Sequence, residues 1–147
     1  MDIQIYNQQR DLSLPKKKLQ AAVKAIIDYE GQACDEVTVH FVSRKNIVAL
    51  HTQFFQDPSP TDCISFPMDS ADIPGYRVLG EIFVCPKAAI DYCAANGGDP
   101  LHETILYVIH GLLHLMDYDD IEPAKRKVMR QAEKRHLKHL QVLKLLD

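Results

Sequence analysis

The sequence predicts an α+β fold in which about five helices cover a small mixed sheet of four strands. Short segments with alternating or β-branched hydrophobic residues occur near residues 3, 38, 64 and 82. Longer segments with hydrophobic residues at helical spacing separate them. A chain of 147 residues with 46% hydrophobic and 25% charged residues is long enough to bury a core. We therefore expect one domain spanning residues 1–147.

The first half of the chain carries two strands and two helices. Residues 3–5 alternate and predict the first strand, and Ser13 with Pro15 supplies a helix start signal. Hydrophobic residues at helical spacing then continue to the stop signal at Gly31. A strand at 37–41 and a helix at 44–55 complete this half.

The second half opens with a turn cluster at residues 57–60. A strand at 61–66 follows, and Pro67 predicts that it lies at an edge of the sheet. Turn composition predicts a loop at 68–76, and the last strand is expected at 80–85. Three helices follow, which begin at Pro86, Pro100 and Pro123.

The helix that begins after the N-cap residue Asp99 carries the most informative motif, a pair of histidines one turn apart. His110 and His114 differ by only about 40° around a helix axis, so they project from one face and can share a cation. Both interrupt a hydrophobic stretch, and carboxylates follow at once. Neutral imidazole suits zinc, and three protein ligands leave a fourth position for water. The sequence predicts a metal site of the catalytic type at the end of a buried central helix.

The third ligand has three candidates, Asp117, Asp119 and Asp120. If the helix continued, Asp117 would lie about 20° from His110 and Asp120 about 80° away. If the helix ends near residue 116, Asp120 can fold back toward the histidines instead. Aspartate tolerates the left-handed conformation that often ends a helix, so Asp117 favours a stop there.

These residues resemble the signature HGxLHLxGYDH of the YbeY family of ribosomal-RNA maturation proteins. The segments Pro60–Pro67 (PTDCISFP) and Leu79–Ile82 (LGEI) are similar to the family's PTDVLSFP and LGDI, at fitting distances. The resemblance implies a zinc-dependent endoribonuclease specific for single-stranded RNA, with one Zn²⁺ per chain. It also implies a role in maturation of the 16S rRNA 3′ end and in ribosome quality control, with ribosomal RNA and the ribosome or its proteins as partners.

Two departures from the family pattern bear on the site. The family's third histidine ligand falls on Asp120, which the resemblance makes the third metal ligand, and the motif glycine falls on Asp117. An aspartate oxygen is a competent zinc ligand. The family's arginine before PTD, thought to meet RNA phosphates, falls in a segment that reads Phe54-Phe55-Gln56 here.

The predicted chemistry uses zinc-bound water as the nucleophile, because zinc lowers the pKa of water to about 7. Asp117 or Asp119 is expected to accept the proton, and Thr61 and Ser65 to line a substrate groove. Glu103 and Tyr107 lie on the helix face of the two histidines, and one of them, foremost Glu103, is expected to support the metal from beneath. His136 and His139, on the basic last helix, are predicted to be surface residues.

Charge and composition place further limits on function. Residues 31–122 hold four Lys or Arg against fourteen Asp or Glu, while the two ends hold thirteen against six. Lys16–Lys18 and the last helix could contact a phosphate backbone or could be a solvated surface. Four cysteines without CxxC spacing favour neither a zinc knuckle nor a redox motif. No signal peptide or membrane-spanning run is apparent, so we expect a cytoplasmic protein without membrane contact.

Two alternatives remain open. Helices with HxxxH also serve zinc metallopeptidases, but those carry a glutamate as base after the first histidine, where this chain has Gly111. The second alternative is a ribosome-associated RNA-binding factor with a non-catalytic metal. The oligomeric state is not predicted.

Overall fold

The computed structural model describes residues 1–68 and 74–147, so most of the predicted loop at 68–76 lies outside the described residues. Four strands and five helices follow one another along the described chain. Their order is β1 (Asp2–Gln8), α1 (Lys16–Tyr29), β2 (Glu36–Val42), α2 (Arg44–Phe55), β3 (Cys63–Pro67), β4 (Val78–Val84), α3 (Pro86–Asn96), α4 (Pro100–Leu115) and α5 (Pro123–Val142). The predicted α+β class, with its small sheet and five helices, is confirmed.

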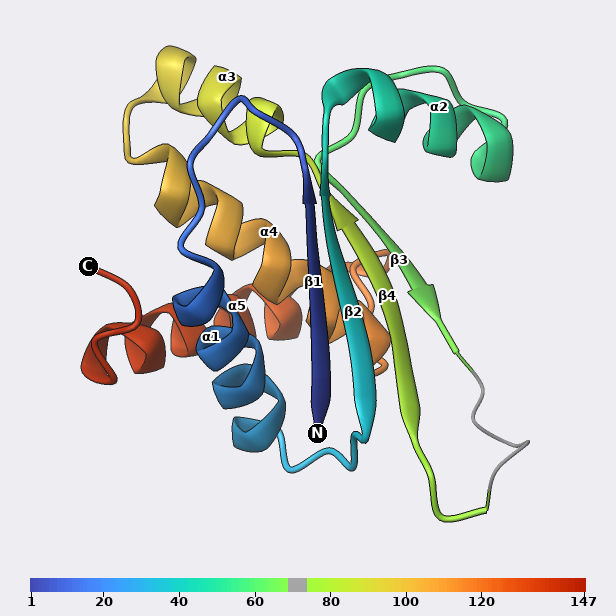
Figure 1. Ribbon diagram of the computed structural model, residues 1–147, viewed down its shortest axis with the longest axis vertical. Helices are drawn as coiled ribbons and strands as arrows, with labels where there is room; N and C mark the ends of the chain where they lie inside the picture. The colour runs from blue at the N-terminus through green and yellow to red at the C-terminus, as the bar shows by residue number, and fades with distance from the viewer. Residues whose placement is uncertain (69–73) are drawn as a thin grey trace.

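The sheet is mixed and has the strand order β1-β2-β4-β3 (Figure 1). The pairs β1–β2 and β2–β4 are parallel, whereas β3 runs antiparallel to β4. β3 therefore lies at an edge, as Pro67 predicted, since proline cannot donate a backbone hydrogen bond to a further strand. The other edge is β1, so β2 and β4 are the central strands of the sheet.

One face of the sheet packs on helices and forms the main core. Figure 1 shows α4 crossing behind the strands, and α1 lies along the same core. Val39 of β2 and Ile82 of β4 are neighbours in register, and both are fully buried against residues of α4 such as Leu112. The opposite face is covered only in part, by α2, through a smaller cluster that includes Ile47 and Ile64.

The helix α4 begins and ends as its sequence predicted. The Asp99 side chain caps it by accepting a hydrogen bond from the Leu101 amide at 2.9 Å. Its last residue is Leu115, and Asp117 then adopts a left-handed φ of 71°. Although α4 is strongly hydrophobic, no helix within residues 1–68 and 74–147 has the length and hydrophobicity to span a bilayer.

Gly111 allows α4 to approach the sheet closely. A Cβ atom at this position would lie 2.7 Å from the Cys63 sulfur and 3.2 Å from Ile82 Cγ2. The Gly111 carbonyl accepts a hydrogen bond of 3.0 Å from the Ser65 hydroxyl of β3. This close contact fixes the helix of the two histidines against the edge strand.

The helix start signal at Ser13 and Pro15 agrees with α1, which begins directly after Pro15, although no side chain caps it. One local prediction is wrong. His136 was expected at the surface, yet it is fully buried, because α5 turns this face toward α1, where Glu30 accepts its hydrogen bond. The Lys and Arg side chains of α5 are exposed, so a basic helix does not exclude buried polar positions on its other face.

Candidate metal centre

Three ligand atoms converge at the end of α4. The Nε2 atoms of His110 and His114 are 3.1 Å apart, and the Asp120 carboxylate oxygens lie 3.6 and 3.7 Å from them. Zinc bonds of 2.0–2.2 Å at tetrahedral angles separate neighbouring ligands by about 3.3–3.6 Å. The observed separations bracket this value, so the two imidazoles and the carboxylate fit a tetrahedral cation with one position left open.

The second ring nitrogen of each histidine has its own partner. His110 Nδ1 lies 2.8 Å from the Glu133 carboxylate, and His114 Nδ1 lies 3.1 Å from the carbonyl oxygen of Tyr118. Both partners only accept hydrogen bonds, so both Nδ1 atoms are the protonated ones. Neutral rings with this tautomer direct the Nε2 lone pairs toward each other and toward Asp120, as metal ligands require.

Glu133 of α5 is the buried partner of His110. Its side chain is only 4% exposed, and Arg130 donates to it at 2.8 Å. Burial alone would raise the pKa of the Glu133 carboxyl, but the hydrogen bonds from His110 and Arg130 hold this pKa below its ordinary value. The carboxylate is thus charged, and it orients His110 from beneath the metal position.

Tyr118 links His114 to a second buried cluster. Its carbonyl accepts from His114, while its hydroxyl donates to Glu30 at the end of α1 at 2.5 Å. The other Glu30 oxygen accepts from His136 Nε2 at 2.8 Å. Burial opposes the charge on Glu30, yet hydrogen bonds from Tyr118 and His136 and the nearby positive charge of Arg135 hold the pKa of Glu30 below its ordinary value. The loop after α4 is therefore fixed from two other helices.

The turn that follows α4 determines which aspartate reaches the histidines. The left-handed Asp117 reverses the chain, and Arg126 then donates to the backbone carbonyls of Asp120 and Ile121 at 3.0 and 3.2 Å. Asp120 faces the histidines as a result. Asp117 and Asp119 instead line a separate hollow beside α5, which neither histidine borders.

Two cavities border the metal group, and His110 lines both of them. The less polar one, of about 350 Å³, is lined by both histidine ligands and by Ser65, whereas Thr61 is not among its lining residues. The polar one, of about 490 Å³, is lined by His110 and carries Glu103 in its wall. No described hydrogen bond joins Glu103 to His110, and Glu133 occupies the supporting position instead.

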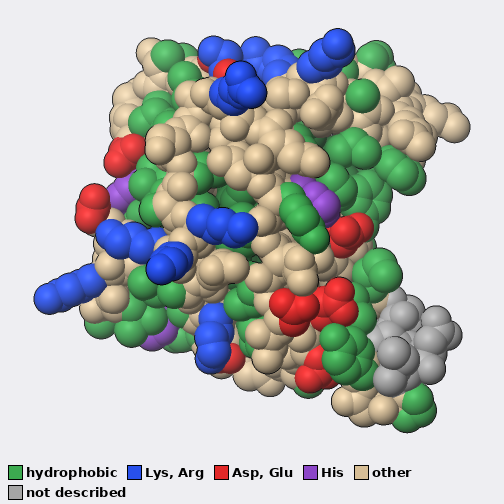
Figure 2. Space-filling model, viewed as in Figure 1, with side chains coloured by type: hydrophobic (Ala, Val, Ile, Leu, Met, Phe, Trp, Pro, Cys, Tyr) green, Lys and Arg blue, Asp and Glu red, His purple; other side chains and the backbone are tan. Residues whose placement is uncertain are grey.

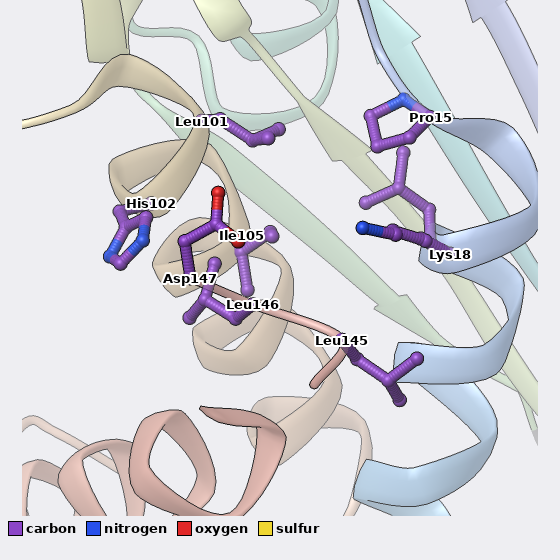
Figure 3. A pocket seen from close by; sticks show the side chains of 9 residues that line it. Pro15, Lys18, Leu101, His102, Ile105, Leu145, Leu146 and Asp147 are labelled. Carbon is purple, nitrogen blue, oxygen red and sulfur yellow. The ribbon is translucent and has the colours of Figure 1, made fainter. Parts of the chain in front are cut away.

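A further cavity lies away from these residues, where α1, the start of α4 and the last residues of the chain meet. It measures about 110 Å³, and Figure 3 shows His102 and Asp147 at its wall and Leu101 and Ile105 beside them. None of the three converging ligands borders it. It is separate from the metal group.

Sequence reasoning missed Glu133 and Glu30. Glu133 of α5 bonds His110 across 23 residues, and Glu30, at the end of α1, bonds Tyr118 in the loop after α4 across 88 residues. One weak signal existed, because Glu133 is the only acidic residue in the sequence of α5. No local pattern marked Glu30.

Comparison with known proteins agrees with this geometry. The family model described as Endoribonuclease YbeY matches residues 4–141. The chain is 50% identical over 139 residues to the Endoribonuclease YbeY of Protochlamydia amoebophila, covering 95% of this chain and 93% of the relative. It is 37% identical to that of Chlamydia trachomatis serovar D, covering 88% and 81%. The solution structure of TM1509 from Thermotoga maritima superposes with a TM-score of 0.65 at 28% identity, covering 92% and 87%. The chain belongs to the Endoribonuclease YbeY family.

Proposed function

We propose that this chain is a zinc-dependent hydrolase that cleaves single-stranded RNA internally. Its proposed role is maturation of the 16S rRNA 3′ end and ribosome quality control, in the cytoplasm and in contact with the ribosome or its proteins. The convergence of two Nε2 atoms and one carboxylate, with both Nδ1 atoms already bonded, carries the proposal. Family membership supports the RNA substrate.

Zinc fits the ligands that the chain offers. Two neutral imidazoles and one carboxylate form a mixed nitrogen and oxygen set of the kind that catalytic zinc sites use. A zinc ion held there supplies a Lewis acid and a water molecule of lowered pKa. Asp120 lowers the net charge of the site relative to a third histidine, which favours divalent cations.

The protein's own residues hold and orient the reacting groups. Glu133 and the Tyr118 carbonyl fix the two rings, so that little reorganisation is needed at the reaction. Ser65 lies in the wall of the adjoining groove, but its hydroxyl donates to Gly111 and so helps to shape that groove. Arg130 lines the polar cavity beside His110, so its guanidinium is placed to contact a phosphate of RNA bound near the metal.

The assignment of the proton acceptor to Asp117 or Asp119 stays a prediction. Both residues lie in the hollow beside α5, so a proton would have to reach them through water. The variants Asp117→Asn and Asp119→Asn test it. A fall in the cleavage rate without loss of zinc would support the assignment, and an unchanged rate would remove it.

A metallopeptidase is less favoured on packing grounds. The glutamate base of HExxH would have to occupy position 111, where even a Cβ atom lies 2.7 Å from the Cys63 sulfur. A binding factor with a non-catalytic metal remains the second candidate. This alternative is favoured by one observation: the segment where the family carries an arginine reads Phe54-Phe55-Gln56 in this chain.

The test uses labelled single-stranded RNA, the matching duplex and casein, each with zinc-loaded protein and with chelator. Cleavage of the single strand that is lost on chelation and in His114→Ala supports the proposal. His102→Ala is the matched control, because this histidine lies on the same helix but borders a different cavity. Casein cleavage alone, or RNA binding without cleavage, would overturn the proposal in favour of one alternative. Analysis of 16S 3′ ends in cells that carry His114→Ala tests the ribosomal role.

A further inference from the structure

Two large aromatic residues stand exposed at the end of α2. Phe54 is 55% exposed and Phe55 is 54% exposed, although exposing such rings to water is unfavourable. The helix ends directly after them, because Gln56 adopts a left-handed φ of 55°. Only Ile47 of this helix is buried, so α2 presents most of its surface outward. Clustered exposed rings of this kind commonly mark a binding surface.

Phe55 borders the same cavity as the metal ligands. The cavity of about 350 Å³ is lined by Phe55, Ile64 and Pro67 together with His110 and His114. A group that contacts the Phe55 ring therefore occupies the groove that leads to the candidate metal. Among the exposed large hydrophobic residues of the described chain, Phe55 alone lines the cavity that both histidines border, and Phe54 lies next to it in the sequence.

The aromatic surface continues from Phe54 and Phe55 across the partly uncovered face of the sheet. Phe54 meets Phe66 of β3 edge to face, with ring centroids 5.0 Å apart, and Phe66 meets Phe83 of β4 at 5.7 Å. Phe83 stacks on His40 at 4.3 Å, with an interplanar angle of 4°. In the face shown in Figure 2, hydrophobic side chains gather below the region of α2. The rings thus form a connected row rather than isolated contacts.

Few positive charges accompany this surface. None of the described residues that line the cavity beside Phe55 is Lys or Arg. On the face shown in Figure 2, Lys and Arg side chains lie mainly along the top and the left, away from that hydrophobic group. Recognition at this point must therefore use apolar and π contacts.

We propose that Phe55 stacks an unpaired nucleobase of the RNA substrate at the mouth of the metal cleft, and that Phe54 extends the aromatic surface beside it. This inference rests on the proposed RNA substrate. Base–aromatic stacking suits it, because every base offers a π face and stacking needs no particular sequence. Stacking also requires an unpaired base, so the two rings would select single strands over duplexes. The occupant is thus a nucleobase rather than a phosphate or a hydrophobic protein segment.

The chain allows a direct spectroscopic test, because it contains no tryptophan. Phe55→Trp places a single fluorescent reporter at the proposed position. Quenching of its emission by an RNA pentamer, with the RNA recovered intact, is the expected result. Tyr29→Trp is the matched control, because Tyr29 is 45% exposed but lies outside the cavity. Equal quenching at both positions, or none at Phe55→Trp, would overturn the proposal.

Affinity measurements give a second, independent test. Phe55→Leu keeps an apolar side chain without a π face and should weaken binding of the pentamer about 10-fold, whereas Phe55→Tyr should retain binding. An abasic pentamer should bind the wild type and Phe55→Leu equally. Phe55→Arg should steepen the salt dependence of log K by about 0.7, the value for one added contact to a single-strand phosphate. Unchanged affinity in Phe55→Leu, or an equal loss for the abasic pentamer, would overturn the proposal.

Both measurements are made with zinc-loaded and with metal-free protein. Binding that depends on Phe55 without any cleavage would sustain this inference while the proposed hydrolase fails. Cleavage that persists at an unchanged KM in Phe55→Leu would do the reverse.

Discussion

His110 and His114 of α4 differ from the buried His136 of α5 in their exposure and in which ring nitrogen is hydrogen-bonded. His110 and His114 have side chains that are 21% and 28% exposed, border a cavity, and have their Nδ1 atoms bonded to acceptors while their Nε2 atoms face each other. His136 is fully buried, bonds Glu30 through Nε2, and leaves Nδ1 without a partner in the described part of the chain.

The difference shows that burial alone does not make a ligand. A ligand histidine needs one nitrogen anchored and the other free at a cavity wall, and the α4 pair has both. Desolvation by burial lowers the pKa of His136 despite the nearby Glu30 carboxylate. A neutral His136 then donates from Nε2 and leaves only an acceptor unpaired at Nδ1, which costs less than burying a second donor and a charge.

The largest expected effect is the loss of the metal in His114→Ala. Removing a ligand should lower zinc affinity by more than about 100-fold, beyond the loss caused by removing outer partners. His136→Gln should keep full zinc occupancy. Competition with a chromophoric chelator measures both variants, and zinc loss in His136→Gln as well would break the distinction between the two kinds of histidine.

The third ligand gives the next effect. Asp120→Ala should lower zinc affinity by more than about 10-fold, since a ligand contributes at least as much as an outer partner. Asp117→Gly is the matched control, because glycine adopts its φ of 71° without strain. Full occupancy with Asp120→Ala in the same chelator titration would show that another carboxylate binds the metal.

The two buried glutamates sharpen the comparison. Glu133→Gln should lower zinc affinity about 10-fold to 100-fold, because the neutral amide no longer orients and polarises His110. Glu30→Gln should change affinity much less, since it acts on His114 only through Tyr118. Equal losses in the two variants would mean that the α1 cluster supports the metal as directly as Glu133 does.

The stability of the metal-free fold should depend on His136, the histidine that is not expected to affect zinc binding. His136→Gln should lower the free energy of unfolding by about 1–3 kcal/mol, because it disrupts a buried hydrogen bond to Glu30. Urea unfolding of the metal-free proteins measures this loss, with His139→Gln as the control on the same helix. A variant as stable as wild type would show that the Glu30–His136 contact contributes nothing to the fold.

The smallest effect is the dependence of stability on pH. The pKa of His136 is lowered below its ordinary 6.5, so below pH 6.5 the unfolded chain binds a proton that the folded chain rejects. The stability contributed by His136 is complete above pH 6.5 and falls as the pH is lowered, by at most about 1.4 kcal/mol per pH unit. His136→Gln should lack this component when metal-free proteins are compared from pH 7 to pH 5.5. Parallel slopes in both proteins would contradict the assignment.

Much of the fold followed from local signals. Asp99 with Pro100 predicted the start of α4, and Asp117 predicted its end, because capping and left-handed turns depend on neighbouring residues. The edge position of β3 followed from Pro67, since proline removes a backbone donor. The convergence of Asp120 on the histidines was expected once the helix stopped there.

The rest depends on contacts between distant segments. Glu133 reaches His110 from α5, and Glu30 reaches Tyr118 from α1, so no window of sequence contains either pair. Ser65 was expected to line a substrate groove, which stays a prediction; it lines the cavity beside the histidines, and tertiary packing directs its hydroxyl to the Gly111 carbonyl, a partner that the sequence did not predict. The periodicity of hydrophobic residues predicts which side of a helix is buried, but it does not predict which residues of other elements contact that side.

The hydrogen bond between His110 and Glu133 has a consequence for biosynthesis. Because α5 is translated after α4, the first histidine lacks its orienting carboxylate until the later helix has been made and has docked. Until then the incomplete chain should bind the cation about 10-fold to 100-fold more weakly, as expected for Glu133→Gln. Tight capture of the cation is thereby coupled to docking of the last helix.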